Sequence, residues 1–194
     1  MINYPWTRNF QRYEYIVESG YVTDREVIDV GAGSAIGSLY LTTRAKRVFA
    51  VDPFLSIERD CRLITYTMAH PERVFYIHEN IYDFIKKVDV CIVVEVMEHM
   101  VSAHCFIKHL TTLCDFAFIT SPLNKETGKT DNPYHNVEFS TKDFDEVINS
   151  EFEILDKVYQ KSDLSIVDSA SYSGSSMDSR HVVQMAWCRR KDGR

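Results

Sequence analysis

The chain has 194 residues, of which 45% are apolar and 26% charged, and its formal net charge is −6. This predicts a single soluble domain over residues 1–194, with a lead-in helix in residues 1–20. The charge argues against a broad nucleic-acid-binding face, and no apolar run approaches the ~20 residues of a membrane helix. With five cysteines and no C-x-x-C pair, we expect free thiols in a cytoplasmic protein without membrane contact.

Short buried runs rich in β-branched residues alternate with amphipathic runs. The former predict seven strands, at residues 26–30, 47–52, 73–77, 88–94, 116–120, 152–159 and 182–188. The latter predict helices at residues 8–19, 34–43, 56–68, 102–113 and 140–149. Such alternation implies an α/β fold with a Rossmann-like, doubly wound, mostly parallel sheet. No clear helix separates the last two strands, which indicates an antiparallel end to the sheet.

A glycine turn follows the first predicted strand. Asp29, Gly31 and Gly33 give the pattern D-x-G-x-G, and the next residues predict a helix. Glycines let a ligand approach the backbone at the mouth of an α/β sheet. The third glycine of a dinucleotide fingerprint would fall at Ile36, and an acid at the strand end suits a cation better than a pyrophosphate.

Three segments together resemble one family. The D-x-G-x-G pattern resembles motif I of the class I S-adenosylmethionine-dependent methyltransferases, although many members have a third glycine where this chain has Ala35. Residues 94–99 (V-E-V-M-E-H) and 132–140 (N-P-Y-H-N-V-E-F-S) resemble segments of the branch that contains ubiquinone-biosynthesis O-methyltransferases and small-molecule methyltransferases. The resemblance implies the class I methyltransferase fold and S-adenosylmethionine as cofactor.

The resemblance also implies a cofactor site. Asp29 would serve the amino group of the cofactor's methionine part. Asp52 lies 21 positions after Gly31, a spacing that suits a carboxylate on ribose hydroxyls. The expected cofactor-binding residues are Asp29, Gly31, Ala32, Gly33, Asp52, Pro53, Glu79, Asn80, Ile81 and Glu95. For Glu79 and Asn80, an ordinary polar loop is an equally good interpretation.

Two histidines are the candidates for chemistry. If the acceptor is a hydroxyl, His99 or His135 is the natural general base. Alternatively, Glu95, Glu98, His99 and His135 resemble the metal ligands of small-RNA 3′-end 2′-O-methyltransferases and would bind Mg²⁺ or Mn²⁺. A third interpretation is that these residues pair locally and only support the loops.

We therefore expect a methyltransferase that acts on a hydroxyl of a small molecule or saccharide. The acceptor would lie near Tyr134, His135 and the Ser- and Asp-rich connection at residues 160–180. The alternatives are an RNA 3′-end 2′-O-methyltransferase, for which a basic path is missing, and a catalytically silent partner subunit. The sequence carries no signal for an oligomeric state.

Overall fold

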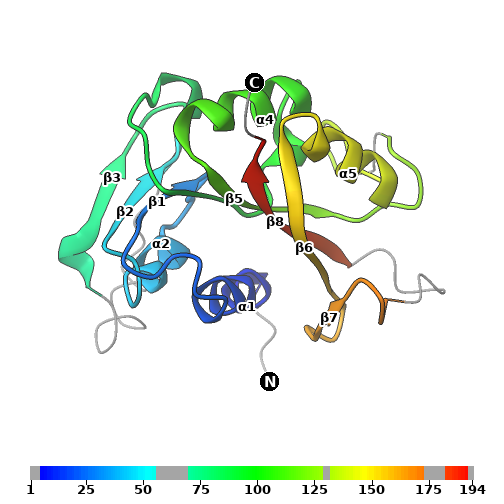
Figure 1. Ribbon diagram of the computed structural model, residues 1–194, viewed down its shortest axis with the longest axis horizontal. Helices are drawn as coiled ribbons and strands as arrows, with labels where there is room; N and C mark the ends of the chain where they lie inside the picture. The colour runs from blue at the N-terminus through cyan, green and yellow to red at the C-terminus, as the bar shows by residue number, and fades with distance from the viewer. Residues whose placement is uncertain (1–4, 56–69, 129–131, 173–181, 192–194) are drawn as a thin grey trace. The chain divides into compact units, whose positions relative to one another are not determined.

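The structure is a computed structural model and describes residues 5–55, 70–128, 132–172 and 182–191 (Figure 1). The chain divides into two compact units, Met1–Val94 and Glu95–Arg194. The helix expected over residues 56–68 lies outside the described residues.

The first unit contains a parallel sheet in which every strand except the third is largely buried. Its strands are β1 (Glu26–Val30), β2 (Arg47–Val51), β3 (Val74–Ile77) and β4 (Val90–Val93), in the order β3-β2-β1-β4. Val30 is in register with both Val51 and Val93. The carboxyl ends of these three strands therefore lie at one edge, which puts the glycine turn beside the residues that follow β2.

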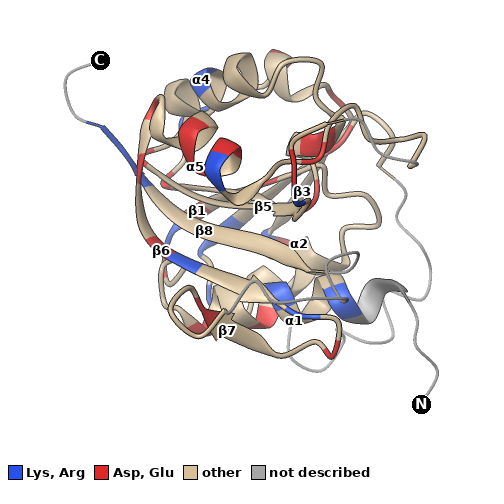
Figure 2. Ribbon diagram, turned by 90° about the vertical axis from the view of Figure 1, so that its right-hand side faces the viewer, with Lys and Arg blue, Asp and Glu red and all other residues tan. Residues whose placement is uncertain are grey.

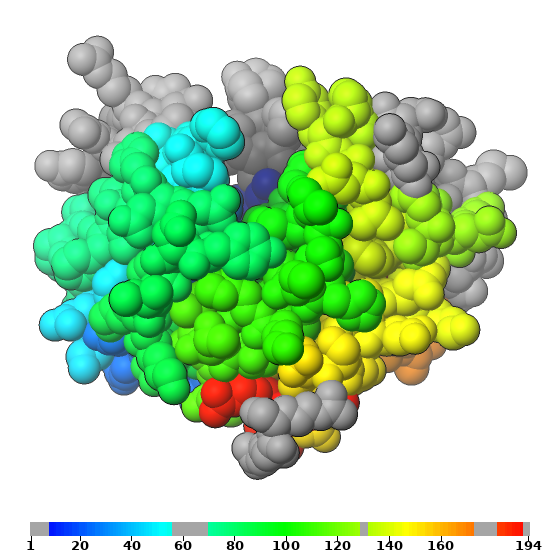
Figure 3. Space-filling model, turned by 90° about the horizontal axis from the view of Figure 1, so that it is seen from above, coloured from blue at the N-terminus to red at the C-terminus, as the bar shows by residue number. Residues whose placement is uncertain are grey.

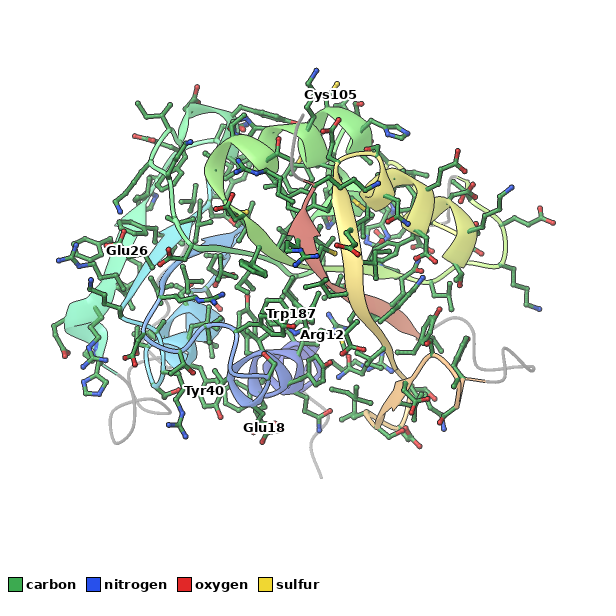
Figure 4. All side chains as sticks on the ribbon, in the orientation of Figure 1. Arg12, Glu18, Glu26, Tyr40, Cys105 and Trp187 are labelled. Atoms are coloured by element: carbon green, nitrogen blue, oxygen red, sulfur yellow. The ribbon has the colours of Figure 1, made fainter. Side chains whose placement is uncertain are left out.

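Two helices of this unit lie side by side, α1 (Pro5–Glu18) and α2 (Ile36–Leu41) (Figure 1). The rings of Phe10 and Tyr40 are 4.8 Å apart at their contact; Figure 4 labels Tyr40. Helix α2 begins two residues later than predicted, because Ala35 has a left-handed φ of 59° and cannot continue a right-handed helix. Two short 3₁₀ turns flank β3, η1 (Pro71–Arg73) and η2 (Ile81–Asp83).

The second unit contains β5 (Phe116–Pro122), β6 (Phe152–Gln160), β7 (Ile166–Asp168) and β8 (Val183–Arg190), in the order β5-β8-β6-β7. Strand β8 runs antiparallel to both β5 and β6, which confirms the reversed last strand. The described residues contain eight strands instead of the predicted seven. The additional one, β7, lies in the connection at residues 160–180, where no strand is predicted, and pairs with β6.

Helices α4 (Ala103–Leu113) and α5 (Thr141–Asn149) pack against each other in the second unit, and both are visible in Figure 3 (green and yellow). The core of this unit includes Trp187 (labelled in Figure 4), whose ring lies 4.9 Å from that of Phe118. Among the described cysteines, Cys91, Cys114 and Cys188 are buried free thiols and Cys105 on α4 is exposed. Each helix within the described residues is too short or too polar to span a bilayer.

Candidate functional site

A pocket opens in the first unit at the end of β1. Helix α1, the glycine turn, the start of α2 and the end of β4 contribute its lining: Asn9, Phe10, Tyr13, Gly31, Ala32, Gly33, Ser34, Ile36, Gly37 and Val94. Ligands of open α/β sheets bind at such carboxyl ends. Gly31, Ala32 and Gly33 thus lie at the pocket, where the sequence predicts them.

The glycine turn has a conformation that requires its glycines. Gly31 and Gly33 have φ angles of 68° and 53°, in the left-handed region that side chains disfavour. The N–H groups of Gly31 and Ala32 donate to the Val51 carbonyl at 2.8 and 3.3 Å. A Cβ atom at Gly33 would meet no atom within 4 Å, so the turn faces open space. This bare backbone is suited to a closely approaching ligand.

Asp52 lies beside the turn, as its spacing predicts. Its Oδ2 accepts a hydrogen bond from the Gly33 N–H at 2.9 Å, and its Oδ1 accepts one from the Phe54 N–H at 2.7 Å. The carboxylate is only partly buried. It therefore fixes the turn and keeps contact with solvent.

The other predicted cofactor residues of this unit do not line the pocket. Pro53, Glu79 and Asn80 are exposed, whereas Ile81 is buried. The Asn80 side chain accepts a hydrogen bond from the Tyr82 N–H at 3.1 Å and caps η2. These residues follow β2 and β3 at the same edge of the sheet as the turn.

Asp29 is completely buried and also absent from the pocket lining. Its Oδ1 accepts a hydrogen bond from the Tyr13 hydroxyl at 2.9 Å, and its Oδ2 accepts one from Ser38 at 2.5 Å. Burial raises the pKa of Asp29 to about 6, although both hydrogen bonds oppose the shift. Burial, with Asp29 close by, also raises the pKa of Tyr13 well above its usual value.

The roles of Tyr13 and Ser38 do not follow from the sequence pattern. Tyr13 occupies an apolar position of the amphipathic α1 and would pass for a core residue. The available signal is its hydroxyl, since a buried Tyr O–H usually has a hydrogen-bond partner. An acid at the end of a buried strand is a natural partner.

A second group of polar residues lies within the second unit. Ligand atoms of Glu98, His99 and His135 all lie within 4.8 Å of one another. Glu98 and His99 belong to the 3₁₀ turn η3 (Met97–His99), and His135 follows β5 in a loop. Glu98 is fully buried, His99 is exposed and His135 is intermediate. We call these three residues the Glu–His–His cluster.

Hydrogen bonds orient both imidazoles. His99 Nδ1 lies 2.7 Å from the Tyr134 carbonyl, and because a carbonyl only accepts, this nitrogen carries the proton. His135 Nδ1 lies 2.6 Å from a carboxylate oxygen of Glu138. The Nε2 atom of each ring is thus the basic nitrogen, and that of His135 lies 3.0 Å from Asn132 Nδ2.

Glu95 does not belong to the Glu–His–His cluster. It has a left-handed φ of 55°, its N–H donates to Thr120 Oγ1, and the Thr120 hydroxyl donates to its carboxylate, each at 3.0 Å. The structure therefore brings together three of the four residues predicted as metal ligands. The fourth, Glu95, is held outside the Glu–His–His cluster by its hydrogen bonds with Thr120 on β5.

No protein-family model matches the sequence, and no curated protein matches it. Solved structures match over nearly the whole chain. The 1,6-didemethyltoxoflavin-N1-methyltransferase of Burkholderia thailandensis, solved with S-adenosylhomocysteine, is 16% identical, with coverage of 94% of this chain and 78% of that chain and a TM-score of 0.69. N-methyltransferase NodS from Bradyrhizobium japonicum, also solved with S-adenosylhomocysteine, is 11% identical, with coverage of 98% and 90% and a TM-score of 0.66.

A third similar structure has a different activity. The [4+2]-cyclase SpnF is 13% identical, with coverage of 94% of this chain and 81% of that chain and a TM-score of 0.70. The same fold thus supports more than one reaction, and the reaction must be argued from the site. The matched structures confirm the predicted architecture: the chain has the fold of the class I S-adenosylmethionine-dependent methyltransferases.

Proposed function

We propose that the chain is a methyltransferase that transfers a methyl group from S-adenosylmethionine to a hydroxyl of a small molecule or saccharide. The observation that carries this proposal is the pocket around the Gly31–Gly33 turn, at the carboxyl end of a parallel strand. Two neighbours of the same fold were solved with S-adenosylhomocysteine, the product of that cofactor.

The cofactor would bind along the sheet edge of the first unit. The turn would contact the methionine part through its backbone, and the partly exposed Asp52 would accept hydrogen bonds from ribose hydroxyls. Pro53, Glu79, Asn80 and Ile81 follow the adjacent strands and are the candidates for adenine contacts. We retain Glu95 as a cofactor residue on the family resemblance alone.

The protein does not need to activate the methyl donor, because the sulfonium of S-adenosylmethionine is already reactive. The protein must align the acceptor with the methyl group and exclude water. An acceptor hydroxyl must also lose its proton. His99 and His135 are the candidate bases, because the Nδ1 of each imidazole is oriented by an acceptor and its Nε2 has the lone pair. The Nε2 of His135 accepts a hydrogen bond from Asn132 Nδ2, which it would have to release before it takes a proton.

The same cluster is suited to a divalent ion. One carboxylate and two imidazoles within 4.8 Å provide the donors that Mn²⁺ accepts, and the histidines already donate Nδ1–H to a carbonyl and a carboxylate, as metal-bound histidines usually do. A bound ion would lower the pKa of an acceptor hydroxyl. Glu98, His99 and His135 would hold it, with Glu138 orienting His135.

The metal-binding interpretation keeps the RNA 3′ end as a second candidate acceptor, since its two neighbouring hydroxyls suit a divalent ion. The charge of the chain disfavours an RNA acceptor. The net charge is −6, and α5 carries both acidic and basic residues rather than a basic face (Figure 2). A strand of RNA needs clustered Lys and Arg. A small hydroxylated molecule has no such requirement.

Calorimetry tests the cofactor. S-adenosylmethionine and S-adenosylhomocysteine should bind, with and without Mn²⁺, and NAD should not. Gly31→Val is the negative control, because a β-branched residue at a φ of 68° is strained and its side chain would enter the cofactor's path. Binding of NAD alone would refute the proposal. Binding without methyl transfer to any of a panel of hydroxylated acceptors would favour a silent subunit or another reaction, such as a cyclisation.

A further inference from the structure

Helix α1 forms one wall of the cofactor pocket. Asn9, Phe10 and Tyr13 face the glycine turn across it. A helix at the edge of a domain keeps such a position only if something fixes it there. The fixing contacts therefore bear on what the pocket can hold.

Tyr13 makes two of the contacts that fix α1, one to β1 and one to α2. Its hydroxyl donates to Asp29 on β1 at 2.9 Å. Its ring lies against the backbone of α2, so closely that a Cβ atom added at Gly37 would lie 2.1 Å from Cζ. Only a glycine at position 37 leaves room for the ring. Tyr13 is itself 7% exposed, so this contact is part of the core.

Asp29 is placed to hold Tyr13 rather than a ligand. Both of its oxygens accept hydrogen bonds from hydroxyls of the protein, and its side chain has no exposed surface. A buried carboxylate is costly unless it is hydrogen-bonded. Ser38 anchors it to α2, which leaves Tyr13 as its link to α1.

We infer that Asp29 is a positioning residue that acts on cofactor binding through Tyr13, by holding α1 as a wall of the pocket, and not by contact with the cofactor's amino group. This inference rests on the proposed function, because it assumes that the pocket binds S-adenosylmethionine. It differs from the role that the family resemblance gives to this acid. The two roles make opposite predictions for a ligand without an amino group.

The test compares two ligands. S-adenosylhomocysteine has the amino acid part, and 5′-methylthioadenosine lacks it. Asp29→Asn and Tyr13→Phe should each weaken the binding of both ligands by a similar factor, on the order of tenfold, because each variant weakens or removes the charge-assisted hydrogen bond between Tyr13 and Asp29. The double variant should bind no worse than the weaker single variant, since residues that act as one unit are not additive. Amide hydrogen exchange in α1 should quicken in all three.

A third variant displaces the ring without changing the acid. Gly37→Ala should weaken the binding of both ligands and quicken amide hydrogen exchange in α1, because the new Cβ collides with Tyr13. Gly128→Ala is the matched control, since a Cβ there meets nothing within 4 Å. Its binding should be unchanged. If Gly37→Ala does not fold, the comparison of Tyr13→Phe with Asp29→Asn still tests whether Asp29 acts through Tyr13.

Two results would overturn the inference while leaving the proposed function intact. The first is an Asp29→Asn variant that binds S-adenosylhomocysteine weakly and 5′-methylthioadenosine normally, which would mean direct contact with the amino group. The second is additive losses in the double variant. Failure of the unmodified protein to bind either ligand would instead refute the proposed function.

Discussion

The buried carboxylate of Asp29 links the stability of the first unit to pH. Burial raises its pKa to about 6 in the folded chain, whereas an unfolded Asp titrates near 3.9. Between these values the folded state holds a proton that the unfolded state has lost. Stability therefore rises as pH falls from about 7 towards 4, and this contribution is absent above the folded pKa.

The size of this effect follows from the shift. Two pKa units correspond to about 3 kcal/mol as an upper value. Urea unfolding between pH 4 and pH 8 should show the slope, and Asp29→Asn should remove it, because an amide does not titrate in this range. A slope that survives in Asp29→Asn would assign it to another group.

The two histidines of the Glu–His–His cluster allow a second prediction. If they hold one ion, His99→Ala and His135→Ala should reduce turnover alike, and a chelator should abolish turnover until Mn²⁺ or Mg²⁺ is restored. Cofactor binding should persist throughout. His104→Ala on the exposed face of α4 is the control and should be active. Full turnover without a divalent ion would exclude the metal and leave one histidine as the base.

At the scale of elements, the buried strands are the easiest part to predict and the loops the hardest. The sequences of β1 and β4 are rich enough in apolar, β-branched residues to be predicted as strands. Strand β7 escapes prediction because its three residues, in a polar stretch, owe their conformation to pairing with β6. The late start of α2 depends on the left-handed Ala35. The available marker is the glycine that many members of the resembled family have at this position, because glycine tolerates a positive φ.

The same limit applies to the site. The glycine turn and the approach of Asp52 follow from local pattern and spacing. The contact of Tyr13 with Asp29 joins residues 16 positions apart in different elements, and it depends on tertiary packing. Glu95 leaves the predicted ligand set because its left-handed backbone and the Thr120 hydroxyl direct it elsewhere.

The cap of α5 supports a prediction at this scale. Ser140 is the N-cap of α5, and its hydroxyl accepts a hydrogen bond from the Asp143 N–H at 3.2 Å. Ser140→Ala should lower the free energy of unfolding by about 1 kcal/mol. Thr112→Ala on α4 also removes a helix hydroxyl, but one that only bonds the His109 carbonyl. Urea unfolding should show a smaller loss of free energy of unfolding for Thr112→Ala than for Ser140→Ala. Equal losses in the two variants would contradict a stabilising role of the Ser140 cap.

For the whole molecule, binding of the cofactor product should raise thermal stability. A ligand at 100 times its Kd stabilises the folded state by about 2.7 kcal/mol. For a chain of this length, that corresponds to an increase in Tm of about 5–10 °C. Thermal unfolding with S-adenosylhomocysteine should show the increase, and NAD at the same concentration serves as the control. Equal shifts with both would argue against a site specific for the methyl donor.

The fold itself is shared with methyltransferases and with a cyclase, so it narrows the chemistry without choosing it. This chain combines an open glycine turn in one unit with two oriented imidazoles in the other. Both were marked in the sequence by short motifs.

The position of β8 in the chain has a consequence during synthesis. Phe116 on β5 pairs with Arg189 on β8, and β8 also pairs with β6. On the ribosome, β5 and β6 therefore emerge long before the strand that must lie between them. Until then each has an unpaired edge open to other chains, a known route to aggregation. The sheet of the second unit can therefore be completed only after residues 183–190 have been made.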